Sequence, residues 1–421
     1  MERFNPWWQG EPDESFQQWQ SRKVKWVPNI INTVKLEPFA LHFLTGPRQI
    51  GKTTAIKILI NRLQKEVPQK AIFYYQCDEL IDYKELGDIL DSYYSARDHW
   101  NIHNSYIFLD EITFVEDWWR AIKARIDQNR MKNDVIILTG SASVELLKEK
   151  ERFPGRRGNG QDLRLLPLTF DKYIELFTNL ELRKLEITEL DKIPAAYAVN
   201  RVYSEKIDHL FQDYLISGGF PLAIIDYAEK GKIMESTKRS YIDWLKADMQ
   251  KINKNERYMK EVIQSIIQSR LSPVSWLSIT KNTSINAPHT TESYISALES
   301  IYAIIILYYL QPDNKIDYKK NKKIHFIDPF LYRLLAEYTR TEILTEHIVE
   351  SVVATHLARK IPTYYWRNKT EVDTIGIING EQVGFEVKWG PKSWKSPLHL
   401  KQVHLLTKEV IPQFLGTINF E

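Results

Sequence analysis

The chain has only one cysteine, Cys77, in 421 residues, and its net charge is only +3. A single cysteine excludes disulfide bonds within the chain and a zinc site built from several thiolates. Cys77 belongs to the apolar run 71–77, where a small buried side chain is expected. The small net charge means that any nucleic-acid-binding surface must be a local patch.

Long hydrophobic runs are also absent. The longest uncharged apolar stretch, residues 300–312, is too short to cross a bilayer, and residues 1–8 have no signal-peptide core. We therefore expect a cytoplasmic protein without a membrane partner. Apolar residues make up 43% of the chain and charged residues 26%, which is typical of globular proteins with two to four domains at this length.

The sequence around residue 46 predicts a phosphate-binding loop. An apolar run at 39–44 predicts a buried strand, and the spacing Gly-x4-Gly-Lys-Thr follows it. The glycines let backbone N–H groups surround a triphosphate such as ATP, Lys52 places a cation on its terminal phosphates, and Thr53 offers a hydroxyl to Mg²⁺. The predicted nucleotide-binding residues are Gly46, Pro47, Arg48, Gln49, Ile50, Gly51, Lys52, Thr53 and Thr54.

Residues 39–168 alternate apolar runs with amphipathic stretches, which is typical of an α/β domain with a parallel sheet. One expected strand ends in Asp110 and Glu111, at the sheet edge where such domains bind ligands. Asp110 is predicted to bind Mg²⁺ and Glu111 to deprotonate the attacking water. The alternative is the start of a solvated loop. The expected strands are 39–45, 71–77, 105–110, 134–140 and 163–167.

Three further side chains are candidates for the γ-phosphate. Thr139 and Ser141 follow an apolar run, and their hydroxyls would bind phosphate or the attacking water, or cap the next helix. Arg156, in the segment Gly-Arg-Arg-Gly, suits an arginine supplied by a neighbouring subunit. It also suits a nucleic-acid phosphate contact or a solvated loop.

Beyond residue 170 the pattern is mostly helical. Helices expected at 170–177, 203–217 and 236–250 are interrupted at Gly218-Gly219 and Pro221, and we interpret them as a lid over the nucleotide. The charged segment 181–202 is predicted to be mobile.

Residues 256–328 predict three helices and a hairpin. The helices are expected at 257–269, 274–281 and 290–302, followed by apolar runs at 303–310 and 324–327. This is the plan of a winged helix, whose last helix enters a DNA groove while wing lysines contact phosphates. The alternative is a helical bundle whose hairpin is lysine-rich for solubility. The hairpin lysines are Lys315, Lys319, Lys320, Lys322 and Lys323.

The last eighty residues contain a second group of candidate catalytic residues. Asp373 lies in an alternating stretch, and Glu386 and Lys388 follow after the turn Asn379-Gly380, so a hairpin brings the two carboxylates together. Asp373 and Glu386 would hold Mg²⁺ or Mn²⁺, and Lys388 would position a water or stabilise a phosphorane. Glu350 lies on a helix expected at 345–360. The alternative is a strand pair with a surface salt bridge.

These motifs together resemble a known family. Over nearly its whole length the chain is similar to prokaryotic AAA-type P-loop ATPases that carry a winged-helix region and a C-terminal PD-(D/E)XK nuclease-like domain, with Val372 in place of the motif proline. The resemblance rests on segments 46–54, 109–112, 139–141, 155–158, 165–170, 218–221 and the acidic hairpin. It implies an N-terminal extension (1–36), an ATPase core (37–170), a helical lid (171–255), a winged-helix region (256–335) and a restriction-endonuclease-like α/β domain (336–421).

The resemblance implies an ATP-driven machine that associates with nucleic acid, in the first place DNA, and forms a homo-oligomer. Our first hypothesis is therefore an Mg²⁺-dependent ATPase acting on DNA, with a metal-dependent nuclease domain. The alternative is an ATP-driven regulatory switch whose C-terminal domain binds a partner without cutting. A defence or toxin-like element would share the chemistry of the first hypothesis.

Overall fold

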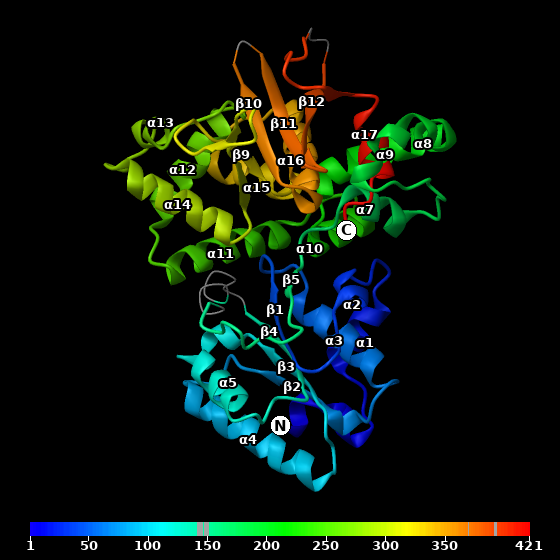
Figure 1. The fold of residues 1–421 in the computed structure, drawn as a ribbon, viewed down its shortest axis with the longest axis vertical. Helices are drawn as coiled ribbons and strands as arrows, with labels where there is room; N and C mark the ends of the chain where they lie inside the picture. Colours follow the sequence, from blue (N-terminus) through cyan, green and yellow to red (C-terminus); the bar gives the residue numbers. More distant parts are fainter. Residues whose placement is uncertain (141–145, 147–150, 369, 391–393) are drawn as a thin grey trace. The chain divides into compact units, whose positions relative to one another are not determined.

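The computed structural model describes residues 1–140, 146, 151–368, 370–390 and 394–421. They divide into two compact units, Met1–Leu166 and Pro167–Glu421, which we describe separately (Figure 1). Within these residues no helix is long and apolar enough to cross a membrane.

The first unit contains a sheet of five parallel strands in the order β2-β3-β4-β1-β5. All five expected strands are present, with small shifts at their ends. Every residue of the inner strands β1 and β4 is buried, because a parallel sheet is covered on both faces, and this explains why their sequences are mostly apolar. The strands are β1 (Ala40–Thr45), β2 (Ile72–Gln76), β3 (Tyr106–Asp110), β4 (Val135–Thr139) and β5 (Asp162–Arg164).

Helices cover both faces of this sheet. Helix α3 lies on one face with α1 and α2, and α4 and α5 lie together on the other (Figure 1). The fully buried Cys77 lies in the core between the sheet and α4, as expected for a small core side chain. The helices are α1 (Glu14–Ser21), α2 (Ile30–Thr33), α3 (Lys52–Leu63), α4 (Tyr83–His99) and α5 (Trp118–Asp127).

The N-terminal residues belong to the first unit. Trp7 is 1% exposed, and its indole N–H donates to the carbonyl of Ile72 at 3.1 Å. Trp8 donates to the same carbonyl at 2.9 Å and stacks on Phe73 and Tyr93. These contacts fix the N-terminal residues to strand β2 of the first unit.

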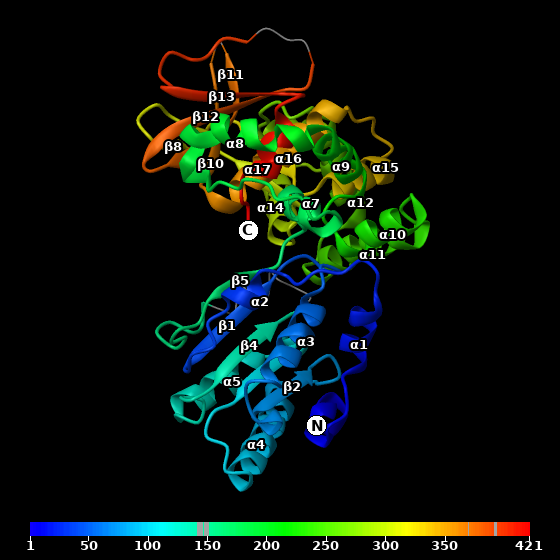
Figure 2. The ribbon, with the colours of Figure 1, turned by 90° about the vertical axis from the view of Figure 1, so that its right-hand side faces the viewer.

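The second unit contains a six-stranded mixed sheet in the order β13-β12-β11-β10-β7-β8 and a separate antiparallel pair, β6 and β9. Helix α16 packs against β9 and against β10, β11 and β12 of the large sheet (Figure 2). The strands are β6 (Ile304–Leu307), β7 (Tyr309–Leu310), β8 (Ile316–Asp317), β9 (Lys323–Phe326), β10 (Thr363–Arg367), β11 (Glu371–Ile378), β12 (Glu381–Lys388) and β13 (Gln402–Thr407).

The helices of the second unit pack across long sequence separations. Helix α17 contacts α7, α8 and α9, and α15 contacts α9 and α12, so the segments expected as separate lid, winged-helix and nuclease-like domains share contacts. The helices are α7 (Phe170–Phe177), α8 (Ile193–Asn200), α9 (Ser204–Ser217), α10 (Pro221–Lys230), α11 (Glu235–Lys251), α12 (Glu256–Gln268), α13 (Trp276–Lys281), α14 (Pro288–Ser300), α15 (Pro329–Thr339), α16 (Thr345–Lys360) and α17 (Ile411–Thr417).

The prediction that 181–202 is a mobile connection is wrong. This segment forms α8 and is fixed to α17: Leu185 N donates to Thr417 O at 3.0 Å, and Asn200 Nδ2 donates to Thr417 Oγ1 at 3.0 Å. Most of its charged residues are exposed, while Leu185, Ile193 and Ala196 are buried.

The predicted break at Gly218-Gly219 is present, and its cause is a close contact with Asp328. Gly218 has φ 59° and ψ −157°, and a Cβ atom there would lie 2.2 Å from Asp328 Oδ1. The Gly219 N–H donates to Asp328 Oδ2 at 2.7 Å, and the Leu331 N–H donates to Oδ1, so one carboxylate caps α15 and fixes the end of α9. Burial raises the pKa of Asp328 to about 6.

Candidate functional site

The loop between β1 and α3 has the backbone of an anion-binding turn. Gly46 has φ 150°, Gln49 φ 60° and Gly51 φ 94°, and Gly51 caps a helix whose N-terminus begins at Lys52. Only glycine fits at position 46, since a Cβ atom would lie 2.0 Å from Leu165 O. The N-terminal turn of α3 lies directly after this loop, and the N-terminus of a helix favours the binding of an anion.

Lys52 folds back over the same loop. Its side chain is buried to 7% exposure, and its ammonium donates to Gly46 O and Pro47 O at 3.0 Å each. The cation is thus held at the loop itself, where the predicted phosphates would bind.

Thr53 and Asp110 are in direct contact, as predicted. Thr53 Oγ1 donates to Asp110 Oδ2 at 2.7 Å, although β4 separates β1 from β3 in the sheet. The hydroxyl of Tyr74, on β2, donates to the same oxygen at 3.0 Å, and the Glu111 N–H donates to Oδ1 at 3.1 Å. The role of Tyr74 was not predicted, although its strand pairs with the acidic end of β3.

Burial raises the pKa of Asp110, which is 2% exposed, while the hydrogen bonds from Thr53 and Tyr74 oppose this effect. A buried carboxylate at the end of a parallel strand, in contact with a phosphate-loop hydroxyl, offers oxygen ligands of the type that Mg²⁺ prefers. The donor set fits this ion.

Glu111 and Thr139 flank this contact. Glu111 leaves β3 with φ 56° and is half-buried. Thr139 ends β4 opposite Leu44 of β1, and its hydroxyl is buried without a hydrogen-bond partner among the described residues. A buried hydroxyl between the phosphate loop and the acidic pair is an available donor for a ligand. Ser141, the alternative candidate, lies outside the described residues.

Arg156 lies at the opposite edge of the sheet. Its Nε donates to Asp127 Oδ1 at 2.6 Å, at the end of α5 just before β4 begins. The next residue is also at this edge, because the Leu41 N–H near the start of β1 donates to Arg157 O at 3.0 Å. Arg156 is therefore near the amino ends of the strands, whereas the phosphate loop follows a carboxyl end.

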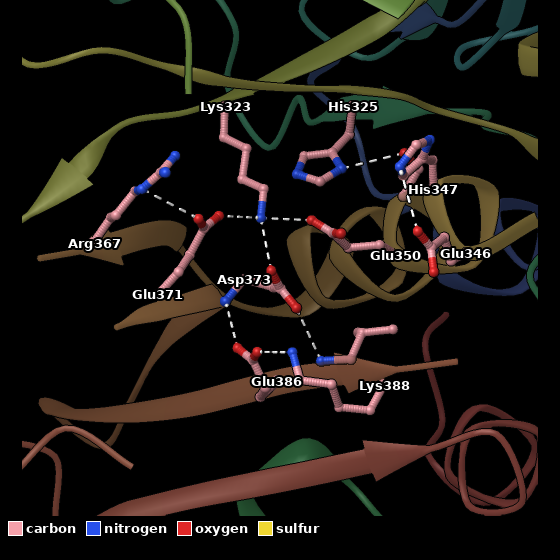
Figure 3. A network of polar contacts seen from close by, with 12 residues as sticks. Lys323, His325, Glu346, His347, Glu350, Arg367, Glu371, Asp373, Glu386 and Lys388 are labelled. Carbon is pink, nitrogen blue, oxygen red and sulfur yellow. Dashed lines mark hydrogen bonds and ion pairs between the residues drawn. The ribbon is translucent and has the colours of Figure 1, made fainter. Parts of the chain in front are cut away.

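In the second unit, the predicted residues Asp373, Glu386, Lys388 and Glu350 lie around one pocket (Figure 3). The Asp373 N–H donates to Glu386 Oε2 at 3.2 Å, and Lys388 contacts Glu386 Oε1. The pocket has a volume of about 230 Å³ and is also lined by Glu371 and Lys323, which were not predicted as site residues.

Lys323 is the main correction to the sequence interpretation, which placed it among the solvent-exposed lysines of a DNA-binding wing. Its side chain is only 1% exposed, and its ammonium lies 2.5 Å from Glu350, 2.8 Å from Glu371 and 2.8 Å from Asp373 (Figure 3). As the first residue of β9 it faces α16 and β11, so the hairpin carries it inward. Among the described residues, no group of three or more His, Cys, Asp or Glu side chains is arranged to hold a metal ion.

The charged groups in this pocket strongly shift one another's pKa values. Burial would lower the pKa of Lys323, but the three carboxylates raise it well above its ordinary value. Burial together with Asp373 raises the pKa of Glu350 to about 8 and that of Glu386 to about 7. Burial favours the protonated form of Asp373 as well, but Lys323 outweighs it and lowers this pKa. The ammonium therefore stays charged and Asp373 stays ionised.

The segment expected to form a winged helix has the predicted order of three helices followed by an antiparallel pair, β6 and β9. Helix α14, expected to enter a DNA groove, exposes His289, Glu292, Ser296 and Glu299, and its sequence has no lysine or arginine. Basic residues gather elsewhere. A pocket of about 520 Å³ is lined by Lys319, Lys320, Arg367, Tyr309 and Tyr365, together with Pro273 and Asn321.

The first unit has the features of a P-loop nucleoside triphosphatase domain. These are a parallel sheet, a glycine loop that carries a lysine and leads into a helix, and an aspartate on another strand that contacts the hydroxyl after that lysine. Residues 39–174 match a family model described as an AAA domain, so this part of the chain is an AAA-type P-loop ATPase domain. Residues 208–342 match a model described as a domain of unknown function.

The chain is 29% identical over 194 residues to the uncharacterized protein MJ1637 of Methanocaldococcus jannaschii. This match covers 44% of the chain and 39% of the relative, so the chain spans about two fifths of that relative's length. The structure resembles that of the Walker-type ATPase of Pyrococcus abyssi, with 15% sequence identity and a TM-score of 0.43. The match covers 70% of this chain and 90% of that chain. It also resembles the Thermotoga maritima RuvB Holliday junction branch migration motor, with 14% identity, 75% and 91% coverage and a TM-score of 0.32. We base the assignment of the first unit on the family match and the site geometry.

Proposed function

We propose that the first unit hydrolyses ATP with Mg²⁺, using the loop 46–54, Asp110 and Glu111. The observation that carries this proposal is the 2.7 Å hydrogen bond from Thr53 Oγ1 to Asp110 Oδ2, which joins the phosphate loop to the acidic end of β3. The match of residues 39–174 to an AAA domain supports the same conclusion.

Each residue has a separate task in this mechanism. Thr53 and Asp110 would hold Mg²⁺, which neutralises charge on the β- and γ-phosphates when it is bound. Lys52 exchanges its loop carbonyls for the terminal phosphates. Glu111 accepts a proton from the attacking water, and the Thr139 hydroxyl donates to the γ-phosphate or orients that water.

Lys52→Ala is expected to weaken ATP binding by about 10²-fold or more, because losing one partner of a buried charge pair costs about 2–5 kcal/mol. The described hydrogen bonds of the Lys52 ammonium go to two loop carbonyls. Losing these two bonds does not deprive a carboxylate of its partner. Titration with a fluorescent ATP analogue measures the change. The exposed Lys65→Ala serves as the matched control. Equal affinity in Lys52→Ala and the control would contradict the site.

We also propose that the second unit binds nucleic acid through the basic pocket around Lys319 and Lys320. Three cations line it for phosphate contact, and the partly exposed ring of Tyr309 offers a surface on which a base can stack. Lys320 lies 5.8 Å from the centre of the Tyr309 ring, so charge and aromatic surface are adjacent. DNA is the first candidate. The glutamates on α14 favour this pocket over that helix as the contact surface.

The double variant Lys319→Glu/Lys320→Glu is expected to weaken binding of single-stranded DNA about tenfold or more at low salt, since two phosphate contacts become repulsive. Fluorescence anisotropy at several salt concentrations measures both the affinity and its salt slope. Lys206→Glu/Lys232→Glu is the control, because both lysines are exposed in the same unit and the change in charge is identical. If both double variants bind alike, or if no nucleic acid binds or stimulates the ATPase, the regulatory-switch alternative is favoured.

Metal-dependent cutting by the second unit has less support than ATP hydrolysis. Of the two carboxylates expected to hold a divalent cation, Asp373 contacts the Lys323 ammonium and Glu386 pairs with Lys388, and among the described residues they do not fit a metal ion in this arrangement. We derive no cleavage step from them.

A further inference from the structure

In the carboxylate pocket of the second unit, the ammonium group of Lys323 lies among the carboxylates. Lys323 enters from β9, Glu350 from α16, and Glu371 and Asp373 from β11, so three elements meet at one ammonium (Figure 3). Each of the three carboxylates lies within 2.8 Å of the nitrogen. An ammonium has three N–H donors, and three carboxylates surround this one.

A divalent cation would need the same oxygens. Mg²⁺ and Mn²⁺ bind carboxylate oxygens at about 2.0–2.2 Å, a distance that leaves no room for the Lys323 nitrogen between Glu350, Glu371 and Asp373. The pocket of about 230 Å³ beside the cluster is open to solvent ions, because the exposed Ser272 and the partly exposed Glu346 and Lys388 line it. Occupation by lysine, and not burial of the pocket, is therefore what excludes a metal.

The other described basic side chains around the cluster do not contact Glu350 and Asp373 as Lys323 does. Arg367 lies 3.5 Å from Glu371 on the outer side, and Lys388 pairs with Glu386. His325, two residues after Lys323 on β9, is fully buried, and burial together with Lys323 lowers its pKa to about 3, so it is neutral. Within the described residues, Lys323 is the cation that contacts Glu350 and Asp373 directly.

We propose that the Lys323 ammonium permanently occupies a divalent-cation position in the second unit, so that this unit works without a metal and an uncharged residue at 323 creates a metal site from Glu350, Glu371 and Asp373. The inference is independent of ATP hydrolysis, because the carboxylate cluster lies entirely within the second unit.

The test uses the full-length, nucleotide-free protein and Mn²⁺, with free Mn²⁺ measured by electron paramagnetic resonance. Lys323→Met is expected to bind one Mn²⁺ more than the wild type, and adding Asp373→Asn is expected to abolish the gain. Lys322→Met is the matched control, since Lys322 is the neighbouring lysine and donates to Tyr318 O instead of a carboxylate. Any Mn²⁺ at Thr53 and Asp110 is common to all variants and cancels in the comparison.

Two outcomes overturn the proposal: an equal number of Mn²⁺ ions in wild type and Lys323→Met, or a gain that survives Asp373→Asn. Lys323→Met leaves three carboxylates without their cation, so Lys323→Met/Glu350→Gln serves as a second variant with less charge and two remaining ligands. Its unfolding temperature is expected to rise with Mn²⁺ while that of Lys322→Met changes only as the wild type does. No difference between these responses would also overturn the proposal.

Discussion

Glu111→Gln is expected to leave ATP binding unchanged and to lower kcat for ATP hydrolysis by about 10²- to 10⁴-fold. Glutamine keeps the size of the side chain and the φ of 56° at this position, but it cannot accept a proton from water. Asp110 and Thr53, which would hold Mg²⁺, are expected to stay in contact, because their hydrogen bond does not involve the Glu111 side chain and the Glu111 backbone N–H still donates to Asp110. A coupled ATPase assay and titration with a fluorescent ATP analogue measure the two quantities.

Glu116→Gln is the control for this experiment. Glu116 is exposed and follows the same strand at a short distance, so its replacement changes net charge in the same way without touching the proposed site. Normal turnover in Glu111→Gln would show that another group deprotonates the water.

Arg156→Ala is expected to lower kcat by about 10³-fold if its guanidinium stabilises the γ-phosphate of a neighbouring subunit. Arg156 lies near the amino ends of the strands, so it does not reach the phosphate loop of its own chain from this position. Mixing two inactive variants distinguishes an arginine supplied by a neighbouring subunit from one that acts within its own chain. Lys52→Ala and Arg156→Ala should each be inactive alone, and their mixture should regain part of the activity, because an Arg156 from one chain completes the intact loop of the other.

The control is Asp127→Asn, which removes the same ion pair and keeps the guanidinium. It should retain most of the wild-type activity. Full activity of Arg156→Ala would remove this residue from the site, and an inactive mixture of folded variants would argue against a contribution from a second chain.

The sequence was sufficient for the first unit because its signals are local. Strands β1 to β4 are mostly apolar runs, and the loop glycines and the acids at the end of β3 stand at fixed places relative to those runs. The contact between Thr53 and Asp110 followed from the rule that carboxyl ends of parallel strands share one edge. The contribution of Tyr74 could not be predicted in this way, because the order of β2 and β3 decides it.

The second unit was predicted less well because its decisive contacts are not local. A lysine in a basic hairpin is normally exposed, and the burial of Lys323 depends on carboxylates up to 50 residues away. Helix α10 was missed although Pro221 at its first turn is a starting signal. Helix α8 was missed because its flanking segment is highly charged.

The packing of α17 against α7, α8 and α9 has a consequence for synthesis. Lys184 and Asn200 find their partners in α17 only 232 and 217 residues later. At about 5–20 residues per second, the early helices of the second unit emerge from the ribosome tens of seconds before the segment that completes their core. During that interval the apolar surface that later packs against α17 is uncovered, and we expect this surface to favour aggregation of nascent chains. The first unit, in contrast, has all the strands of its sheet by residue 164.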